Sequence, residues 1–318
     1  MGITTRVVYM GTAPFAVPTL QKLFEAGYAI PGVITQPDKP VGRGQNLQAS
    51  PVKRKAQEIH LPVYQPSTLK DGNAQALFRA LDPDIMVVVA YGKIIPSWLL
   101  QLPKYGAVNL HGSLLPKYRG AAPIHWAIAN GETETGVCTM QIDEGLDTGP
   151  VYQCERLPIQ SDETVQQVSE KLAEIGSGLM LGTLEGVIAG NLQPHPQDNA
   201  KATYAPILKK SHGHIDWRQP AGEIHNRVRA FNPWPGSVTR FRGAVCKILK
   251  SKPGDGTNSG APGAIVASKH ALAVVCGDSR LLELLEVQPE NRKPVAGTAF
   301  ANGAHISAGE KFEPVGDN

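Results

Sequence analysis

The chain has 318 residues, of which 42% are hydrophobic and 19% are charged, as in an ordinary globular protein with room for about two domains. The formal net charge of +3 is too small to indicate a polyanion-binding protein without knowing where the charges lie. No apolar run approaches the roughly 18 residues of a membrane span, and the first residues lead directly into a strand pattern, so we expect a cytoplasmic protein that is neither membrane-bound nor secreted.

The first third of the sequence alternates between strand-like and helix-like segments. Short β-branched or apolar runs predict strands at 6–11, 29–36, 62–66, 84–92 and 106–113. Between them, helical spacing with turn or cap residues predicts helices at 14–27, 51–59, 73–80 and 96–101. Apolar strands that alternate with helices indicate a Rossmann-like, mostly parallel sheet with helices on both faces.

The pattern continues to residue 190 and then changes. A helix near 122–129, strands at 136–143 and 150–159, and a long amphipathic helix at 161–190 complete the first part. The next segment is polar, proline-bearing and aperiodic, which is typical of a linker between domains. We therefore divide the chain into a catalytic domain at 1–189, a linker at 190–209 and a second domain at 210–318.

Short strands separated by turn residues dominate this second domain. A helix at 219–231 precedes strand-like runs at 236–242, 244–251, 263–268, 271–277 and 280–289, a pattern that predicts a small OB-like β-barrel. From Pro206 to the end the sequence holds 15 Lys and Arg against 10 Asp and Glu, a net charge of +5, whereas the remaining 16 and 18 give −2. This asymmetry favours a polyanionic partner for the second domain, although solvated surfaces of this charge are also common.

Several classes of chemistry find no support in the sequence. The glycine fingerprint of dinucleotide-binding enzymes is absent after the first strand, and no nucleophilic Ser or Cys occupies a recognisable elbow. The four cysteines lie far apart, without metal-ligand spacing, so we expect four reduced thiols, no disulfide and no metal site; they are Cys138, Cys154, Cys246 and Cys276.

Three polar residues combine into a set that can handle a carbonyl group. Asn109 and His111 lie two apart at the end of a predicted strand, so their side chains share one face, and Asp147 lies in a glycine-flanked turn between two later strands. Singly, each fits a structural role as a cap, a bonded imidazole or a turn former. Together they supply an amide donor for an oxyanion, a base near neutral pKa and a carboxylate that holds the imidazole.

The two segments that hold these residues, "NLHGSLLPKYRGAAP" at 109–123 and "DEGLDTG" at 143–149, resemble the folate-dependent formyltransferases. Three further stretches resemble the members of that family that formylate the methionine on initiator tRNA: residues 10–20, 35–53 and 229–238. The resemblance implies direct transfer of a formyl group from 10-formyltetrahydrofolate, without a metal, to the α-amine of that methionine. The chain is expected to act as a monomer.

The resemblance also assigns roles to residues. It implies Asn109, His111 and Asp147 as the catalytic set and a folate-binding turn made of Ser113, Leu114, Leu115 and Pro116. It further implies that the loop around Arg43 and Lys39 reaches the acceptor stem of the tRNA, although a mobile solvated loop would have the same composition. Basic residues of the second part are candidates for phosphate contacts: Lys209, Lys210, Arg218, Arg227, Arg229, Arg240 and Arg242.

Other functions remain open at this point. A formyltransferase that acts on an amino sugar nucleotide would carry a similar core and C-terminal barrel, but it would not need the basic second domain or the Gly-Arg-Gly loop. A purine-precursor enzyme would need little beyond the catalytic domain, and a formyl-folate hydrolase, whose acceptor is water, would need no basic appendage. A non-catalytic RNA-binding protein would explain the charge and leave Asn109, His111 and Asp147 unexplained.

Overall fold

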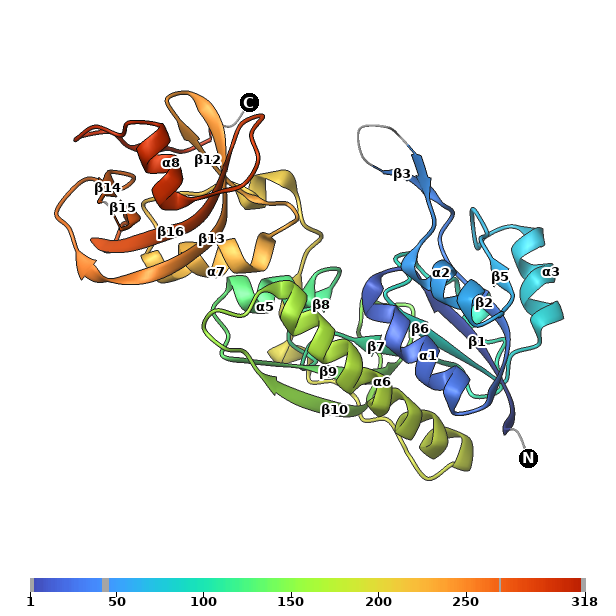
Figure 1. Ribbon diagram of the computed structural model, residues 1–318. Helices are drawn as coiled ribbons and strands as arrows, with labels where there is room; N and C mark the ends of the chain where they lie inside the picture. The colour runs from blue at the N-terminus through green and yellow to red at the C-terminus, as the bar shows by residue number, and fades with distance from the viewer. Residues whose placement is uncertain (1–2, 42–45, 269, 316–318) are drawn as a thin grey trace. The chain divides into compact units, whose positions relative to one another are not determined.

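A computed structural model describes residues 3–41, 46–268 and 270–315 (Figure 1). The chain forms two units, each built from more than one segment. Unit 1 comprises Met1–Pro123, Thr135–Leu157 and Ser169–Ala205, and unit 2 comprises Ile124–Glu134, Pro158–Val168 and Pro206–Asn318. The domain limits derived from the sequence stay a prediction.

A seven-stranded sheet forms the centre of unit 1, with the strand order β10-β9-β7-β6-β1-β2-β5. The strands from β7 to β5 run parallel, whereas β9 runs antiparallel to β7. The bounds are β1 Ile3–Gly11, β2 Tyr28–Ile34, β5 Val63–Tyr64, β6 Ile85–Val89, β7 Ala107–His111, β9 Glu134–Gln141 and β10 Val151–Pro158. The Rossmann-like α/β class is confirmed, with antiparallel strands added at one end.

Helices cover both faces of this sheet. One face is covered by α3 (Gly72–Leu81) and α4 (Ser97–Leu100). Phe78 of α3 and Leu99 of α4 form one buried cluster with the even-numbered residues Val8 and Met10 of β1. On the other face lie α1 (Val17–Glu25), which follows the 3-10 turn η1 (Pro14–Ala16), and α6 (Val165–Ala189); α2 (Pro51–Glu58) packs against α1. The alternation of side chains along each strand thus separates the two apolar layers.

α6 has the length and composition of a candidate membrane span, but it contacts the sheet. A Cβ placed at Gly176 would lie 2.7 Å from Leu110 and 3.0 Å from Val137, and Thr183 exchanges a 2.7 Å hydrogen bond with Thr139 of β9. These contacts are those of a helix that packs on the sheet of unit 1.

Two short strand pairs decorate unit 1, and neither was predicted. β3 (Lys39–Val41) pairs with β4 (Asn46–Gln48) as an antiparallel hairpin that extends from the sheet in Figure 1. β8 (Arg119–Gly120) pairs in parallel with β11 (Tyr204–Ala205), which follows the 3-10 turn η2 (Asn199–Lys201). The second pair ties the segment after α6 to the loop after β7.

The expectation of four reduced thiols is wrong for two of them. Cys138 of β9 and Cys154 of β10 form a disulfide, with 4.1 Å between their Cα atoms, because adjacent strands bring together residues that lie 16 apart in the chain. The spacing of the cysteines in the sequence did not reveal that Cys138 and Cys154 lie on adjacent strands. Cys246 and Cys276 are buried free thiols, and burial raises the pKa of each to about 12.

Unit 2 contains a curled antiparallel sheet with the strand order β14-β15-β16-β13-β12-β18, and β17 also pairs with β16. The two ends of this path meet, since Ala264 bridges Lys311 and the Phe312 N–H donates to the Gly263 carbonyl over 2.8 Å. The predicted small barrel is thereby confirmed in class. The strand bounds are β12 Ser237–Phe241, β13 Ala244–Thr257, β14 Ile265–Ala267, β15 Leu272–Val275, β16 Arg280–Pro289, β17 Val295–Ala296 and β18 Phe312–Glu313.

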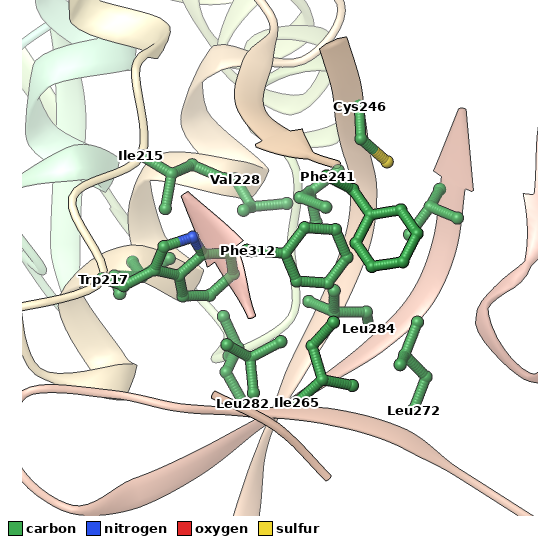
Figure 2. Close-up of a cluster of buried hydrophobic side chains, with 14 of the residues drawn as sticks. Ile215, Trp217, Val228, Phe241, Cys246, Ile265, Leu272, Leu282, Leu284 and Phe312 are labelled. Carbon is green, nitrogen blue, oxygen red and sulfur yellow. The ribbon is translucent and has the colours of Figure 1, made fainter. Parts of the chain in front are cut away.

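An aromatic and aliphatic core fills this sheet, as Figure 2 shows. Trp217 stacks on Phe312 with ring centroids 5.8 Å apart, and its indole N–H donates a 2.9 Å bond to Thr239 Oγ1. The helices of unit 2 are α5 (Pro123–Ala129, in the unit from Ile124), α7 (Ala221–Phe231) and α8 (Gly297–Gly303), with the 3-10 turn η3 at Lys210–Gly213. Val228 of α7 and Phe300 of α8 both contribute to the core.

Candidate active site

Asn109 and His111 lie at the carboxyl end of β7, where ligands bind in open α/β sheets. Asn109 pairs with Val88 of β6, which belongs to the buried cluster under α3 and α4, and His111 pairs with Cys138 of β9. Since Asn109 and His111 are two residues apart on one strand, the side chains of both point to the face that α3 and α4 cover. Asn109 is partly exposed, and its amide makes no hydrogen bond within the part of the chain that the structure describes. That amide is therefore available to a ligand.

The two nitrogens of the His111 ring face different groups. Nε2 lies 3.0 Å from the carbonyl oxygen of Tyr118, and because a carbonyl only accepts, Nε2 carries the proton. Nδ1 lies 3.7 Å from Oδ2 of Asp147, which is too long for a hydrogen bond but short enough for charge attraction when the ring is protonated. The structure thus brings His111 and Asp147 together. Nε2 is bonded to Tyr118, so Nδ1 is the ring nitrogen that can bind a reactant.

Asp147 is held in a strained turn. Its φ of 52° lies in the left-handed region, which Asp adopts more readily than most residues do. Oδ2 accepts a 2.8 Å hydrogen bond from the backbone N–H of Gly120, in the loop after β7. About a fifth of the Asp147 side chain remains exposed, so the carboxylate is fixed and still reaches the solvent.

The predicted folate-binding turn follows β7 directly. Ser113 is fully buried, and its hydroxyl donates a 2.6 Å bond to the carbonyl of Lys117, so the hydroxyl closes the turn. The peptide bond between Leu115 and Pro116 is cis. Leu114, Leu115 and Pro116 are partly exposed, and they offer an apolar edge beside the end of β7.

The basic residues predicted to bind RNA belong to different elements of the two units. Lys39 is exposed at the start of the β3–β4 hairpin, and next to it Asp38 is held by Lys53 Nζ at 2.7 Å and by Gln65, hydrogen bonds that lower the Asp38 pKa. Arg43 lies outside the described residues. Lys209 and Lys210 are exposed at the start of η3 in unit 2.

All five of the other candidate arginines are engaged within the protein, Arg227 with the His212 carbonyl and Arg240 with the Gly243 carbonyl. Arg229 is buried and donates a 3.0 Å bond to the Glu163 carbonyl, so it is a structural residue, contrary to the expectation of a phosphate contact. Arg218 and Arg242 form exposed ion pairs with Asp216 and Glu310. Exposed pairs of this kind exchange readily and do not prevent a phosphate contact.

Sequence reasoning missed two residues beside the site. Gln197 donates from Nε2 to the carbonyls of Asp147 and Gly149, over 2.9 and 2.7 Å. Its Oε1 accepts from Arg119, which is buried. The bridge of His195 with Val151 and the pairing of β8 with β11 hold this segment against the Asp147 loop, and nothing in an aperiodic polar segment signals such pairing.

The loop after β6 was also missed, although it lies at the same sheet edge. Ala90 has a φ of 44°, an uncommon conformation for a residue with a Cβ that is often found near functional sites. Ile94 is 87% exposed, and so is 61% of Leu146, next to Asp147. Exposed apolar side chains at a strand edge provide surface for a flat, partly apolar ligand.

The described residues contain no group of three or more His, Cys, Asp and Glu side chains that could hold a metal ion. The site therefore consists of an amide, an imidazole and a carboxylate around the end of β7. Such a set can donate to a developing oxyanion and move a proton.

Comparison with known proteins also indicates a formyl transferase. A family model described as formyl transferase matches residues 5–184, and one described as formyl transferase, C-terminal domain, matches residues 207–305. The methionyl-tRNA formyltransferase of Solibacter usitatus is 47% identical over 307 residues, 96% of this chain and 98% of that protein. The methionyl-tRNA formyltransferase of Trichlorobacter lovleyi is 44% identical over 310 residues, 97% of each chain.

Solved structures share the fold at lower identity. A sugar 3N-formyl transferase, WlaRD, crystallised with dTDP and 5-N-formyl-THF, matches with a TM-score of 0.65 at 22% identity, over 92% of this chain and 100% of that one. HypX from Aquifex aeolicus in complex with tetrahydrofolic acid matches with a TM-score of 0.64 at 16% identity, over 96% of this chain and 48% of that one.

Proposed function

The chain belongs to the formyl transferase family, and from that membership we propose how its own residues carry the reaction. It is an enzyme that transfers the formyl group of 10-formyltetrahydrofolate to the α-amine of methionine on initiator Met-tRNA, for translation initiation. The observation that supports the residue roles is the approach of His111 Nδ1 to Asp147 Oδ2 at 3.7 Å, beside the free amide of Asn109.

We assign Asn109 and protonated His111 to the formyl oxygen. The methionine amine attacks the formyl carbon, a C–N bond forms, and negative charge develops on the formyl oxygen. The Asn109 amide and the N–H at His111 Nδ1 donate to this oxygen, while Nε2 stays bonded to Tyr118. Removal of one such donor typically raises the barrier by about 2.7–4 kcal/mol.

Asp147 is assigned to the proton that the attacking amine loses. When the bond between the formyl carbon and N10 of the folate breaks, N10 takes up one proton, so the reaction conserves protons overall. The Asp147 carboxylate takes this proton from the amine nitrogen and can return it to N10 of the folate, while protonated His111, 3.7 Å away, remains the donor to the formyl oxygen. Because both substrates are bound in one site, proximity supplies much of the remaining rate enhancement.

The folate is assigned to the turn formed by Ser113, Leu114, Leu115 and Pro116. The buried Ser113 hydroxyl fixes the turn, and the partly exposed Leu and Pro side chains supply the apolar contact. Lys39, Arg43, Lys209 and Lys210 are assigned to the tRNA, with the hairpin loop at the acceptor stem. We further propose a cytoplasmic monomer with a catalytic domain at 1–189 and a tRNA-binding domain at 210–318, joined by a linker at 190–209.

One assay tests the activity against its alternatives. The protein is mixed with 10-formyltetrahydrofolate and either initiator Met-tRNA or an amino sugar nucleotide, and the formylated product is measured. Formyl-methionine on tRNA is expected. Retention of RNA without product would indicate a pure binding protein, and product from the sugar alone would indicate the sugar enzymes, which resemble this chain only in fold.

The tRNA role of the hairpin has a separate test. Arg43→Ala is expected to raise KM for Met-tRNA without changing KM for the folate. Arg79→Ala removes an exposed arginine from α3 of the same unit and is the matched control. Equal acceptor kinetics in the two variants would contradict the assignment.

A further inference from the structure

We infer that Gln197, oriented by Arg119, is a positioning residue that sets the place of the Asp147 carboxylate. This inference rests on the catalytic role proposed above for Asp147. Gln197 lies after α6, far from β7 in the sequence, and it touches neither His111 nor Asn109 in the described contacts. It would act on the reaction only through the loop that holds Asp147.

The contacts of Gln197 use its whole amide. Nε2 donates to the Asp147 carbonyl at 2.9 Å and to the Gly149 carbonyl at 2.7 Å. Oε1 accepts from Nε and from Nη2 of Arg119, at 3.0 and 2.8 Å. Because the guanidinium group has only donors, it fixes which end of the amide faces the loop. Both donors of Gln197 are therefore directed at the two carbonyls.

Arg119 is itself fixed by the fold. It is only 2% exposed, and Nη2 also donates to Asn199 Oδ1 at 2.8 Å. Its backbone lies in β8, where its N–H donates to the Thr203 carbonyl at 2.9 Å. A buried guanidinium with these partners has little freedom, so the group that orients Gln197 is rigid.

The same short strand also holds the other end of Asp147. Gly120, the neighbour of Arg119 in β8, donates its N–H to Oδ2 of Asp147. Asp147 is thus bonded at its carboxylate through Gly120 and at its carbonyl through Gln197. These two anchors, Gly120 in β8 and Gln197 bonded to Arg119 of β8, constrain both the backbone conformation of Asp147, with its φ of 52°, and the direction of its side chain.

Loss of the Gln197 donors would leave two loop carbonyls without these bonds and allow the strained turn to relax. The distance from Oδ2 to His111 Nδ1 is already 3.7 Å, so further movement would weaken the pair. Misplacement of a reacting group by about 1 Å costs up to roughly a hundredfold in rate. Binding of folate and tRNA uses other residues in our assignment and should change little.

Gln197→Glu is the sharpest variant. A glutamate keeps an oxygen toward Arg119 but has no N–H for the carbonyls of Asp147 and Gly149. Asp198→Ala is the matched control, because Asp198 is the next residue, is exposed and pairs with Lys201. The measurements are kcat, the two KM values, and the midpoint of thermal unfolding.

We expect Q197E to lower kcat by about tenfold to a hundredfold, with both KM values within about twofold of the wild type. D198A should keep the wild-type kcat. If Q197E does not fold, Gln197→Met removes the donors without adding charge, and the same result is expected of it.

Some results would overturn the inference. These are a kcat of the folded variant within about twofold of wild type, a loss confined to KM, or an equal loss in D198A. If the wild type formylates Met-tRNA and Asp147→Asn is inactive while Q197E is fully active, only this inference fails. If the wild type itself gives no formyl-Met-tRNA, the activity has failed instead; if Asp147→Asn keeps its rate, the proposed role of Asp147 has failed.

Discussion

The backbone N–H of Gly120 donates a 2.8 Å hydrogen bond to Oδ2 of Asp147, the same oxygen that faces His111. A glycine in a two-residue strand thereby controls the direction of a carboxylate in a distant turn. The candidate site depends on this contact between two loops as much as on β7 itself.

The charge of Asp147 can be removed without moving its backbone. Asp147→Asn tolerates the left-handed φ and still offers an oxygen to Gly120, but it neither attracts protonated His111 nor accepts a proton at neutral pH. We expect kcat to fall by about 10²–10⁴, the usual contribution of general acid–base catalysis, with unchanged affinity for Met-tRNA. Steady-state kinetics and filter binding check this, and a variant with normal kcat would remove Asp147 from the mechanism.

Gly120 should not accept a side chain. Its φ is 121°, and a Cβ would lie 2.6 Å from the carbonyl oxygen of Ala205 in β11. We expect Gly120→Ala to cost about 1–3 kcal/mol of unfolding free energy and to lower kcat, because the bond to Asp147 shifts. Gly72→Ala is the control, since nothing lies within 4 Å of that position. Urea unfolding of both variants measures this difference. Equal unfolding free energies would show that β8 can move away from the Ala205 carbonyl at little cost.

Tyr91 carries a buried hydroxyl without a hydrogen-bond partner among the described residues. The side chain is 2% exposed in the apolar cluster beneath α3 and α4, and burial raises its pKa to about 12. Tyr91→Phe removes the uncompensated polar group, so we expect the unfolding free energy to rise by about 1 kcal/mol. A decrease measured in urea would indicate a buried water bonded to the hydroxyl.

The stability of unit 2 should depend on pH through His225. Burial lowers the His225 pKa, and positively charged Arg229 lowers it further, against the opposing effects of the Ser161 carbonyl and Asp162. A histidine with a lowered folded pKa stabilises the fold above its unfolded pKa of about 6.5, and this stability is lost as the pH falls below that value.

His225→Gln tests this effect against other histidines of unit 2. Burial also lowers the pKa of His125 and His212, so the wild type alone does not isolate one residue. We expect the wild type to lose more unfolding free energy than the variant between about pH 7.5 and pH 5.5. Equal losses in denaturant titrations at the two pH values would exclude His225 as a source.

The disulfide determines how many reactive thiols the unfolded protein should expose. Cys138 and Cys154 are paired, so protein unfolded without reductant should expose two reactive thiols, from Cys246 and Cys276, and reduced protein should expose four. The bond closes the β9–β10 segment around the Asp147 turn, and a loop of this size adds about 3 kcal/mol in the chain-entropy model. Reductant should therefore lower the thermal midpoint. Four reactive thiols before reduction would show that the pair is open.

Periodicity in the sequence identified most of the long elements, because a strand or helix of five or more residues repeats its apolar positions, but it missed α8 at Gly297–Gly303. The sheet edge with Asn109 and His111 followed from the same reasoning, and the position of Asp147 in a turn followed from its glycines. What the sequence did not reveal is pairing between distant segments. β8, β11 and β17 have two residues each, too few to alternate; Arg119 lies in β8, and Gln197 follows a single-residue bridge at His195.

The contact between Gly263 and Phe312 has a consequence for behaviour at high concentration. Open antiparallel sheets present unpaired backbone groups at their outermost strands, and those groups recruit strands of other molecules. In unit 2 the outermost strands bond to each other, through the Ala264–Lys311 bridge and the Phe312 N–H. Intermolecular strand addition there would first have to break these bonds, which protects this half of the protein from fibrous self-association.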